Sequence, residues 1–242
     1  MSKLSIIIPA YDEYENLTIL LPKLKEAISK YFISTETNVF IVDSVVENLK
    51  TKNLCESFNF IYINRVPNNY FGDAMRSGIK FVSTEYNSTE WLIIMDSDNS
   101  HNPEMFKEFS EIISTDSADI VIASRYISGG KTENSLLLIF LSKVVNLIYK
   151  NIFNFKIYDI SNNYRLYKFD FLKNIKLVEN NFEIVEEILI KIRNNQPNVR
   201  IKEVPSTFYK REFGKSKRNL FLFFLTYLNS IYKLKKFEKW KV

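Results

Sequence analysis

Short apolar runs alternate along this chain with segments whose apolar residues recur every three or four positions. The apolar runs are residues 4–9, 39–42, 60–63, 91–95 and 119–123. The segments with helical spacing between them include residues 17–31, 74–82 and 103–113. A strand–helix–strand order of this kind predicts an α/β fold with a mostly parallel sheet and helices on both faces. Pro22 interrupts the first helical pattern, and we expect that helix to start late or to kink there.

The composition limits the chemistry. The chain has 242 residues, a net charge of +5, one cysteine and one histidine. An intramolecular disulfide, a cysteine-rich zinc or iron–sulfur site and a histidine-rich metal site are therefore excluded. Because no glycine-rich phosphate-binding loop follows the first predicted strand, a dinucleotide-binding Rossmann domain and a P-loop enzyme are disfavoured. The longest apolar runs, residues 136–141 and 220–228, fall short of the roughly 20 residues that span a bilayer, so we expect no transmembrane helix.

Acidic side chains follow several predicted strands. Asp43 ends the second run, and Asp96 and Asp98 follow the fourth. Ligands of parallel sheets bind at the carboxyl ends of the strands. Two carboxylates one residue apart at this edge could reach one hard cation, such as Mg²⁺ or Mn²⁺ bridging a substrate phosphate. The alternative is a turn or helix cap, since Asp, Ser and Asn all favour turns.

Five segments together resemble a known family. They read PAYDE (9–13), DSDNSHNP (96–103), SRYISGG (124–130), DISNNYR (159–165) and EVPSTFYKREFGKSK (203–217). In this order they are similar to inverting family 2 glycosyltransferases with the GT-A fold. The subgroup they resemble is the polyprenyl-phosphate glycosyltransferases, of the dolichol-phosphate mannose synthase type. The chain departs from the family pattern at Asp12 for Asn, at Ser44-Val45 within D-D-G-S, at Leu138 for Arg and at Asn163 for Gly.

The resemblance implies a set of site residues. Nucleotide-sugar binding is implied for Pro9, Ala10, Tyr11, Glu13, Asp43, Asp96, Ser97 and Asp98. Metal binding, to Mg²⁺ or Mn²⁺, is implied for Asp96, Asp98 and Ser100. Binding of the acceptor phosphate is implied for Arg125, Ser142, Arg165, Arg211 and Lys217. The residues expected to act in catalysis are Asp96, Asp98, Arg125, Arg211 and Lys217. His101 is expected to orient the metal loop rather than to act as a base.

The implied reaction moves a mannose- or glucose-like sugar from a GDP- or UDP-sugar to dolichyl or undecaprenyl phosphate, with inversion. Because a phosphate acceptor is already ionised near neutral pH, a strong general base is less necessary. One alternative is transfer to a saccharide acceptor in cell-surface glycan synthesis. Another is a weakly active nucleotide-sugar-binding subunit that docks to a membrane partner. Nucleic-acid binding is not expected, because the basic tail carries no groove-reading motif.

We expect two parts in the chain. Residues 1–218 form the GT-A domain, and residues 219–242 form an amphipathic, basic tail that associates with the membrane. Residues 220–232 would lie in the membrane plane, with residues 136–149 as a second contact and core helices as the alternative for both. The protein would then be peripheral on the cytoplasmic face. A homo-oligomer or a membrane partner stays open.

Overall fold

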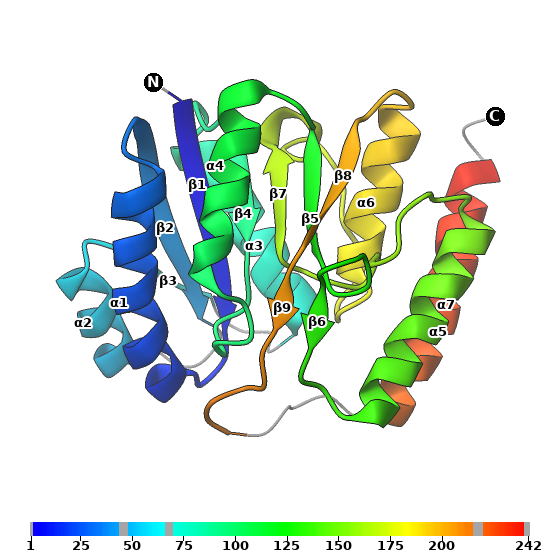
Figure 1. Ribbon diagram of the computed structural model, residues 1–242, viewed down its shortest axis with the longest axis horizontal. Helices are drawn as coiled ribbons and strands as arrows, with labels where there is room; N and C mark the ends of the chain where they lie inside the picture. The colour runs from blue at the N-terminus through cyan, green and yellow to red at the C-terminus, as the bar shows by residue number, and fades with distance from the viewer. Residues whose placement is uncertain (1, 44–47, 66–69, 215–219, 240–242) are drawn as a thin grey trace.

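A mixed sheet forms the centre of the molecule (Figure 1). The computed structural model describes residues 2–43, 48–65, 70–214 and 220–239. The sheet order is β3-β2-β1-β4-β7-β5-β8. Its strands are β1 (Ser2–Ala10), β2 (Thr35–Asp43), β3 (Ile61–Asn64), β4 (Trp91–Ile94), β5 (Ile120–Ser124), β7 (Arg165–Lys168) and β8 (Ile201–Pro205). Strand β7 runs antiparallel to both neighbours, and the other pairs are parallel. The predicted mostly parallel sheet is confirmed, and β7 is the strand that the prediction missed.

Helices cover both faces of the sheet (Figure 1). One face packs against α1 (Tyr14–Tyr31), α2 (Leu49–Ser57) and α4 (Phe106–Thr115), which follows the short helix η1 (Pro103–Met105). The other face packs against α3 (Phe71–Glu85), α5 (Leu136–Ile152), α6 (Ile184–Asn195) and α7 (Leu220–Lys239). Along β1 the side chains alternate, because Ile6 and Ile8 belong to the first core and Ile7 to the second. The short helix η2 (Phe169–Phe171) follows β7.

Helix α1 runs through Pro22 from Tyr14 to Tyr31. The predicted late start is therefore wrong. Leu17, Leu20, Leu21 and Leu24 are fully buried, whereas Pro22 is exposed. Each buried leucine contributes roughly 1.5–3 kcal/mol, and a proline inside a helix costs about 3 kcal/mol. The packing of this helix face thus outweighs the missing hydrogen bond.

The carboxyl end of the sheet carries a two-stranded extension. Strands β6 (Lys131–Thr132) and β9 (Thr207–Phe208) pair in parallel just beyond the ends of β5 and β8. Gly130 precedes β6, and a Cβ there would lie 2.5 Å from the carbonyl oxygen of Ser124. The chain therefore folds back closely over the end of β5, and the segment after β9 is carried across the edge where β1 and β4 end.

Helix α7 packs on the domain beside α5 (Figure 1). Tyr227 and Leu234 are buried in the same core cluster as residues of α3, α5 and α6. The Tyr227 ring lies edge-on to Tyr149 of α5, with 6.0 Å between centroids, and its hydroxyl donates to Glu186 of α6. On this face α7 is a core helix, which was the alternative stated for it, and membrane contact through its other face stays a prediction. Among the described residues, none of the helices combines the length and the apolar character needed to cross a membrane.

Candidate active site

The ends of β1 and β2 bring the predicted nucleotide-binding residues to one edge. Ala10 pairs with Asp43 in the parallel register, so both strands end at the same level. Pro9 and Ala10 are buried, as is Asp43, which accepts a hydrogen bond from the Tyr62 hydroxyl at 3.2 Å. Tyr11 is half-buried and leads into the loop that carries Glu13. The structure thus gathers this predicted group at the carboxyl edge.

The loop after β4 is held in a fixed shape. Asp98 Oδ1 accepts hydrogen bonds from the Ser100 N–H at 3.1 Å and from the Ser100 hydroxyl at 2.5 Å. His101 Nδ1 accepts from the Asp96 N–H at 2.9 Å. The His101 ring is 2% exposed and stacks on Tyr164, with 4.7 Å between centroids. His101 therefore orients the loop in this structure, and the two carboxylates remain partly exposed, at 27% for Asp96 and 20% for Asp98.

Ser97 and Ser100 are placed differently from the predicted substrate and metal contacts. Ser97 is 5% exposed and Ser100 is fully buried. The Ser100 hydroxyl is used in holding Asp98. Metal binding by Ser100 stays a prediction, and in this structure its buried hydroxyl bonds to Asp98. We assign Ser100 to the support of Asp98.

Arg211 lies between two carboxylates of the nucleotide half. Its Nη2 forms an ion pair with Glu13, and its Nη1 lies 3.4 Å from Asp98 Oδ2. The segment that carries it is tied down on both sides, because the Tyr209 N–H donates to Ser100 and the Phe213 N–H donates to the Asn16 side chain. Arg211, for which the resemblance implied acceptor-phosphate binding, therefore lies against two carboxylates of the nucleotide half. Lys217, its predicted companion, lies outside the described residues.

The pKa of Glu13 reflects this setting. Burial raises the pKa of the Glu13 carboxyl above its ordinary value, and the hydrogen bond and charge of Arg211 oppose that rise. Asn16 donates to the other oxygen of Glu13 at 2.6 Å. A carboxylate that would be costly to bury alone is thus stabilised by a guanidinium and an amide.

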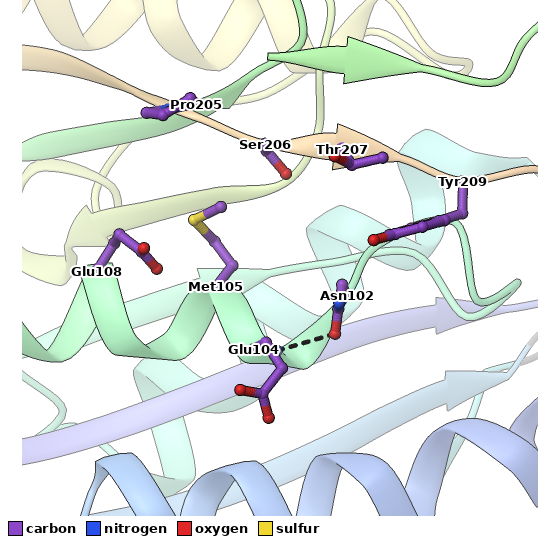
Figure 2. A pocket seen from close by; sticks show the side chains of 8 residues that line it. All are labelled: Asn102, Glu104, Met105, Glu108, Pro205, Ser206, Thr207 and Tyr209. Atoms are coloured by element: carbon purple, nitrogen blue, oxygen red, sulfur yellow. Dashed lines mark hydrogen bonds between the residues drawn. The ribbon is translucent and has the colours of Figure 1, made fainter. Parts of the chain in front are cut away.

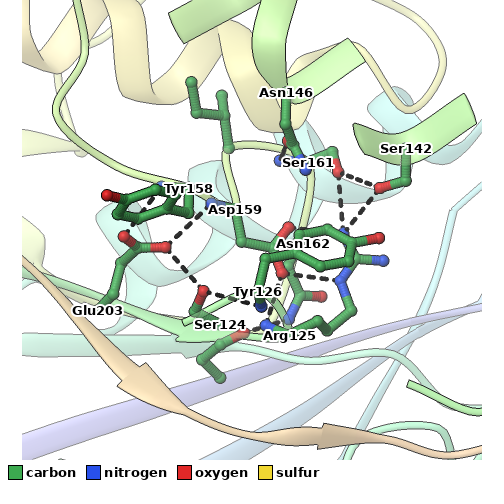
Figure 3. Close-up of polar contacts among 12 residues, drawn as sticks. Ser124, Arg125, Tyr126, Ser142, Asn146, Tyr158, Asp159, Ser161, Asn162 and Glu203 are labelled. Atoms are coloured by element: carbon green, nitrogen blue, oxygen red, sulfur yellow. Dashed lines mark hydrogen bonds and ion pairs between the residues drawn. The ribbon is translucent and has the colours of Figure 1, made fainter. Parts of the chain in front are cut away.

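A second polar cluster forms around Arg125 (Figure 3). Its guanidinium makes two bonds to Asp159, from Nε at 2.8 Å and from Nη2 at 2.6 Å. The same Nη2 lies 2.9 Å from the Ser161 hydroxyl and 3.2 Å from the Ser142 hydroxyl. Burial lowers the pKa of Arg125, but the Asp159 carboxylate raises it above the ordinary value overall. Arg125 is therefore a fixed charge, and Ser142 of α5, which the resemblance implied for the same acceptor phosphate, lies against it.

Arg165 corrects another prediction. The side chain is fully buried, and it donates to the carbonyls of Asn162, Val185 and Ile160 and to the Tyr167 hydroxyl. Because these hydrogen bonds engage its guanidinium inside the core, Arg165 cannot contact an acceptor phosphate in this arrangement. Arg165 instead donates hydrogen bonds to buried backbone carbonyls between β7 and α6.

The segment 159–163 joins the two clusters. Asp159 and Ser161 hold Arg125, Asn162 Oδ1 lies 3.2 Å from His101 Nε2, and Asn163 donates to Asp96 Oδ1 at 3.1 Å. Sequence reasoning treated this stretch as a family motif and assigned no role to these four side chains. Several polar side chains close together before a strand could have indicated a role for this segment. Their hydrogen-bond partners, however, could not be known without the fold. Glu187 of α6 is buried and accepts from Lys191 and two backbone N–H groups.

One hollow lies beside the ends of β8 and β9 and is lined by other side chains (Figure 2). It measures about 210 Å³ and is lined by Asn102, Glu104, Met105, Glu108, Pro205, Ser206, Thr207 and Tyr209. Its exposed carboxylate, Glu104, is already paired with Lys30 and Tyr31. None of the predicted site residues lines it, so we place no substrate there.

The donor set fits a divalent cation that also binds substrate. Asp96 and Asp98 are partly exposed at the strand ends, and a positive group, the Arg211 guanidinium, already lies against Asp98. Mg²⁺ and Mn²⁺ prefer oxygen ligands and commonly use one or two carboxylates together with water and substrate phosphates. Within the described part of the chain, three or more His, Cys, Asp or Glu side chains do not come together as a metal site. These two carboxylates therefore suit a cation that is completed by a diphosphate.

Fold and site together define a GT-A glycosyltransferase. Crystal structures of glucosyl-3-phosphoglycerate synthase from Mycobacterium tuberculosis share the fold. One with Mn²⁺, UDP and phosphoglyceric acid has a TM-score of 0.68 at 12% identity, over 95% of this chain and 76% of that chain. One with Mg²⁺ and UDP has a TM-score of 0.66 at 12% identity, over 95% and 77%. At this identity the likeness shows the fold alone.

The chain belongs to glycosyl transferase family 2, whose model matches residues 5–176. A dolichol-phosphate mannosyltransferase of Pyrococcus furiosus is 31% identical over 98% of this chain. An undecaprenyl-phosphate mannosyltransferase of Micrococcus luteus is 29% identical over 87% of this chain and 85% of its own length. The chain spans 64% of the length of the Pyrococcus protein. The resemblance read from the five segments is thus confirmed at the level of the family.

Proposed function

We propose that this chain transfers a sugar, mannose or a glucose-like hexose, from a GDP- or UDP-sugar to a polyprenyl phosphate. The names of both relatives support a polyprenyl-phosphate acceptor and a mannosyl group. The observation that carries the proposal is the pairing of two clusters, Asp96–Asp98–Arg211 and Arg125–Ser142–Ser161, through the segment 159–163. The first cluster suits a nucleoside diphosphate with a metal cation. The second offers a guanidinium and two hydroxyl groups to a phosphate.

On the donor side, the reaction breaks the bond between the sugar and the diphosphate, and negative charge develops on the leaving group. A bound Mg²⁺ or Mn²⁺, held by Asp96 and Asp98, would supply charge neutralisation there. Arg211 is a protein cation at this site, because it already contacts Asp98 and can turn its planar fork towards phosphate oxygens. Glu13 and Asn16 keep the Arg211 segment in place, since both bind it across the edge of β1.

On the acceptor side, an ionised phosphate oxygen attacks the anomeric carbon, and the nucleoside diphosphate departs from the opposite face. The product is an inverted sugar joined to the lipid phosphate. No side chain has to remove a proton from this nucleophile, because the phosphate is already ionised. Arg125 and the hydroxyl of Ser142 are placed to orient such a phosphate where α5 meets the site.

A saccharide acceptor is less well supported. A hydroxyl nucleophile needs a carboxylate base within reach. The two carboxylates on the acceptor side are engaged, Asp159 with Arg125 and Glu203 with the Ser124 hydroxyl and two backbone N–H groups. Neither is available as a base in this arrangement.

We infer further that the protein is peripheral on the cytoplasmic face, with α5 as its membrane contact. The first turns of α5 expose Leu136, Leu137 and Phe140 at 86%, 57% and 63%. Ser142 of the acceptor cluster lies on the same helix. A polyprenyl chain could therefore remain in the lipid while its phosphate reaches Ser142, with Lys143 adding attraction to anionic headgroups.

The deciding experiment incubates the purified chain with GDP- and UDP-hexoses and a short polyprenyl phosphate, with and without Mn²⁺. The expected result is a sugar-phospholipid product that depends on the metal. A glycan product formed from a saccharide acceptor, with no lipid product, would favour the alternative. Nucleotide-sugar binding without turnover on either acceptor would favour the weakly active subunit.

A further inference from the structure

Asn163 binds one oxygen of a predicted metal-binding carboxylate. The residue lies two positions before β7, and its side chain is 6% exposed. Its Nδ2 donates to Asp96 Oδ1 at 3.1 Å. The amide orientation follows from its neighbour, because the opposite one would place an amide oxygen against a carboxylate oxygen. Asn163 Oδ1 is buried and has no hydrogen-bond partner among the described residues.

The other oxygen of the Asp96 carboxylate, Oδ2, has a different environment. Asp96 Oδ2 lies 3.7 Å from His101 Nε2, too far for a hydrogen bond. Since His101 Nδ1 accepts from the Asp96 N–H, the ring proton of the neutral imidazole is on Nε2, with Asn162 Oδ1 at 3.2 Å as its partner. In the described part of the chain, the hydrogen bond to the Asp96 carboxylate is therefore made at Oδ1, and Oδ2 is the oxygen available to a cation.

We propose that Asn163 restricts Asp96 to binding a cation through one oxygen, and that it thereby favours Mg²⁺ or Mn²⁺ over Ca²⁺. The inference rests on the proposed metal-dependent function. Mg²⁺ requires near-octahedral geometry with single-oxygen contacts, whereas Ca²⁺ accepts more oxygens and commonly takes both from one carboxylate. A charge-assisted hydrogen bond on Oδ1 opposes the two-oxygen mode, because that mode would require the amide to give up its acceptor.

The cost of this arrangement supports a specific role. Burying Asn163 leaves its Oδ1 without a hydrogen-bond partner among the described residues, which is unfavourable for a buried polar atom. The contact with Asp96 is the compensating interaction of this side chain. Glycine, which stands here in the pattern that the sequence resembles, has no side chain to make the contact. Asn163 is thus a positioning residue that acts through Asp96.

Binding of Mn²⁺ alone to the full chain tests the inference. Electron paramagnetic resonance measures the free ion, and competition with Mg²⁺ and with Ca²⁺ gives their relative affinities. In Asn163→Ala, we expect the affinity for Ca²⁺ relative to Mg²⁺ to rise about tenfold, because Asp96 Oδ1 becomes available. Asn163→Ser, which retains a hydroxyl donor, should lie between the wild type and the alanine variant and replaces it if alanine prevents folding.

Asn146→Ala is the matched control. Asn146 is 5% exposed, and its Oδ1 accepts from the Ser161 N–H. Its Nδ2 has no hydrogen-bond partner among the described residues, so Asn146, like Asn163, is a buried amide with one atom bonded and one not. Its loss should destabilise the fold and leave the ratio of Ca²⁺ to Mg²⁺ affinity unchanged. An unchanged ratio in the Asn163 variants, with Mn²⁺ still bound, would overturn this inference alone. A wild-type chain that takes up no Mn²⁺ even when GDP or UDP is added would overturn the metal-dependent function and this inference with it.

Discussion

Arg211 contributes one charge that two carboxylates share. Glu13 and Asp98 come from the ends of β1 and β4, and each is an acceptor of the same guanidinium. Without the guanidinium, these two neighbouring carboxylates would lose the positive charge that they share, and their like charges would repel each other. The same guanidinium would compete with a divalent cation for Asp98. We therefore expect Arg211 to have opposite effects on metal affinity and on catalysis.

We predict that Arg211→Ala binds Mn²⁺ more tightly than the wild type and turns over at least about 100-fold more slowly. The tighter binding follows because the competing cation is gone, and the slower turnover because the leaving diphosphate loses a donor. Titration of free Mn²⁺ and a product assay give the two quantities. Lys210→Ala, at the exposed neighbouring position, should change neither. Weaker Mn²⁺ binding in the Arg211 variant would contradict the competition.

We predict that Asp96→Asn and Asp98→Asn each reduce turnover by about 100-fold or more, a loss of roughly 3 kcal/mol of transition-state stabilisation. An amide keeps the shape but loses the charge that a hard cation requires. Excess chelator should abolish the wild-type activity as well. Asp170→Asn is the control, because that carboxylate is 75% exposed and pairs with Lys173 on the surface. Full activity of the wild type in chelator would refute the metal role.

At the scale of elements, the strand-end motifs could be read from the sequence, but their neighbours could not. Asp43, Asp96 and Asp98 follow apolar runs, and parallel strands bring such residues to one edge. Strand β7 carries little periodic signal in four residues, and its antiparallel insertion between β4 and β5 places Asn163 against Asp96. The Arg211 segment reaches the same edge only because β8 and β9 direct it there. Pairing between strands that are far apart in the sequence cannot be predicted from the local pattern of apolar residues.

We predict that the exposed apolar residues of helix α5 contact the membrane. Replacing Leu137 and Phe140 together by Glu should reduce flotation with anionic liposomes by about tenfold or more, because it removes two apolar groups from the lipid and adds negative charge. Activity on a short, water-soluble acceptor should be retained. Ile33→Glu is the matched control, since Ile33 is 78% exposed and follows α1, a helix that Figure 1 draws well apart from α5. Equal flotation of the double variant and the wild type would place the contact elsewhere, with the remaining face of α7 as the next candidate.

The whole molecule places a group of acids where α6 packs against α5 and α7. Glu179, Glu183 and Glu186 are each at most 3% exposed, and Tyr149 of α5 and Ser230 of α7 are fully buried with them. The sequence shows these acids only as the polar positions of a helical pattern, which normally mark a solvated face. They are buried because α7 returns from the far end of the chain to cover them. A sequence pattern on one helix cannot indicate which distant helix will pack on its polar side.

Glu186 makes this packing dependent on pH. The carboxyl is fully buried, and Tyr227 donates to its Oε1, while its Oε2 has no hydrogen-bond partner in the described structure. Burial raises its pKa to about 8 from 4.5, and Arg165 partly opposes the rise. A carboxyl whose folded-state pKa is raised binds more protons when folded than when unfolded. The stability of the wild type should therefore fall as pH rises from about 4.5 to about 8.

We predict that Glu186→Gln becomes increasingly stable relative to the wild type across that pH range, by up to about 5 kcal/mol, since each pKa unit corresponds to about 1.4 kcal/mol. The amide has no charge to desolvate and can still accept from Tyr227. Urea unfolding at pH 5, 7 and 9 measures the difference in the free energy of unfolding. The neighbouring Glu187→Gln should instead destabilise at pH 7, because Glu187 accepts from Lys191 and from the N–H groups of Val178 and Glu179. A Glu186→Gln difference that stays constant with pH would show that α7 packs on an ionised carboxylate.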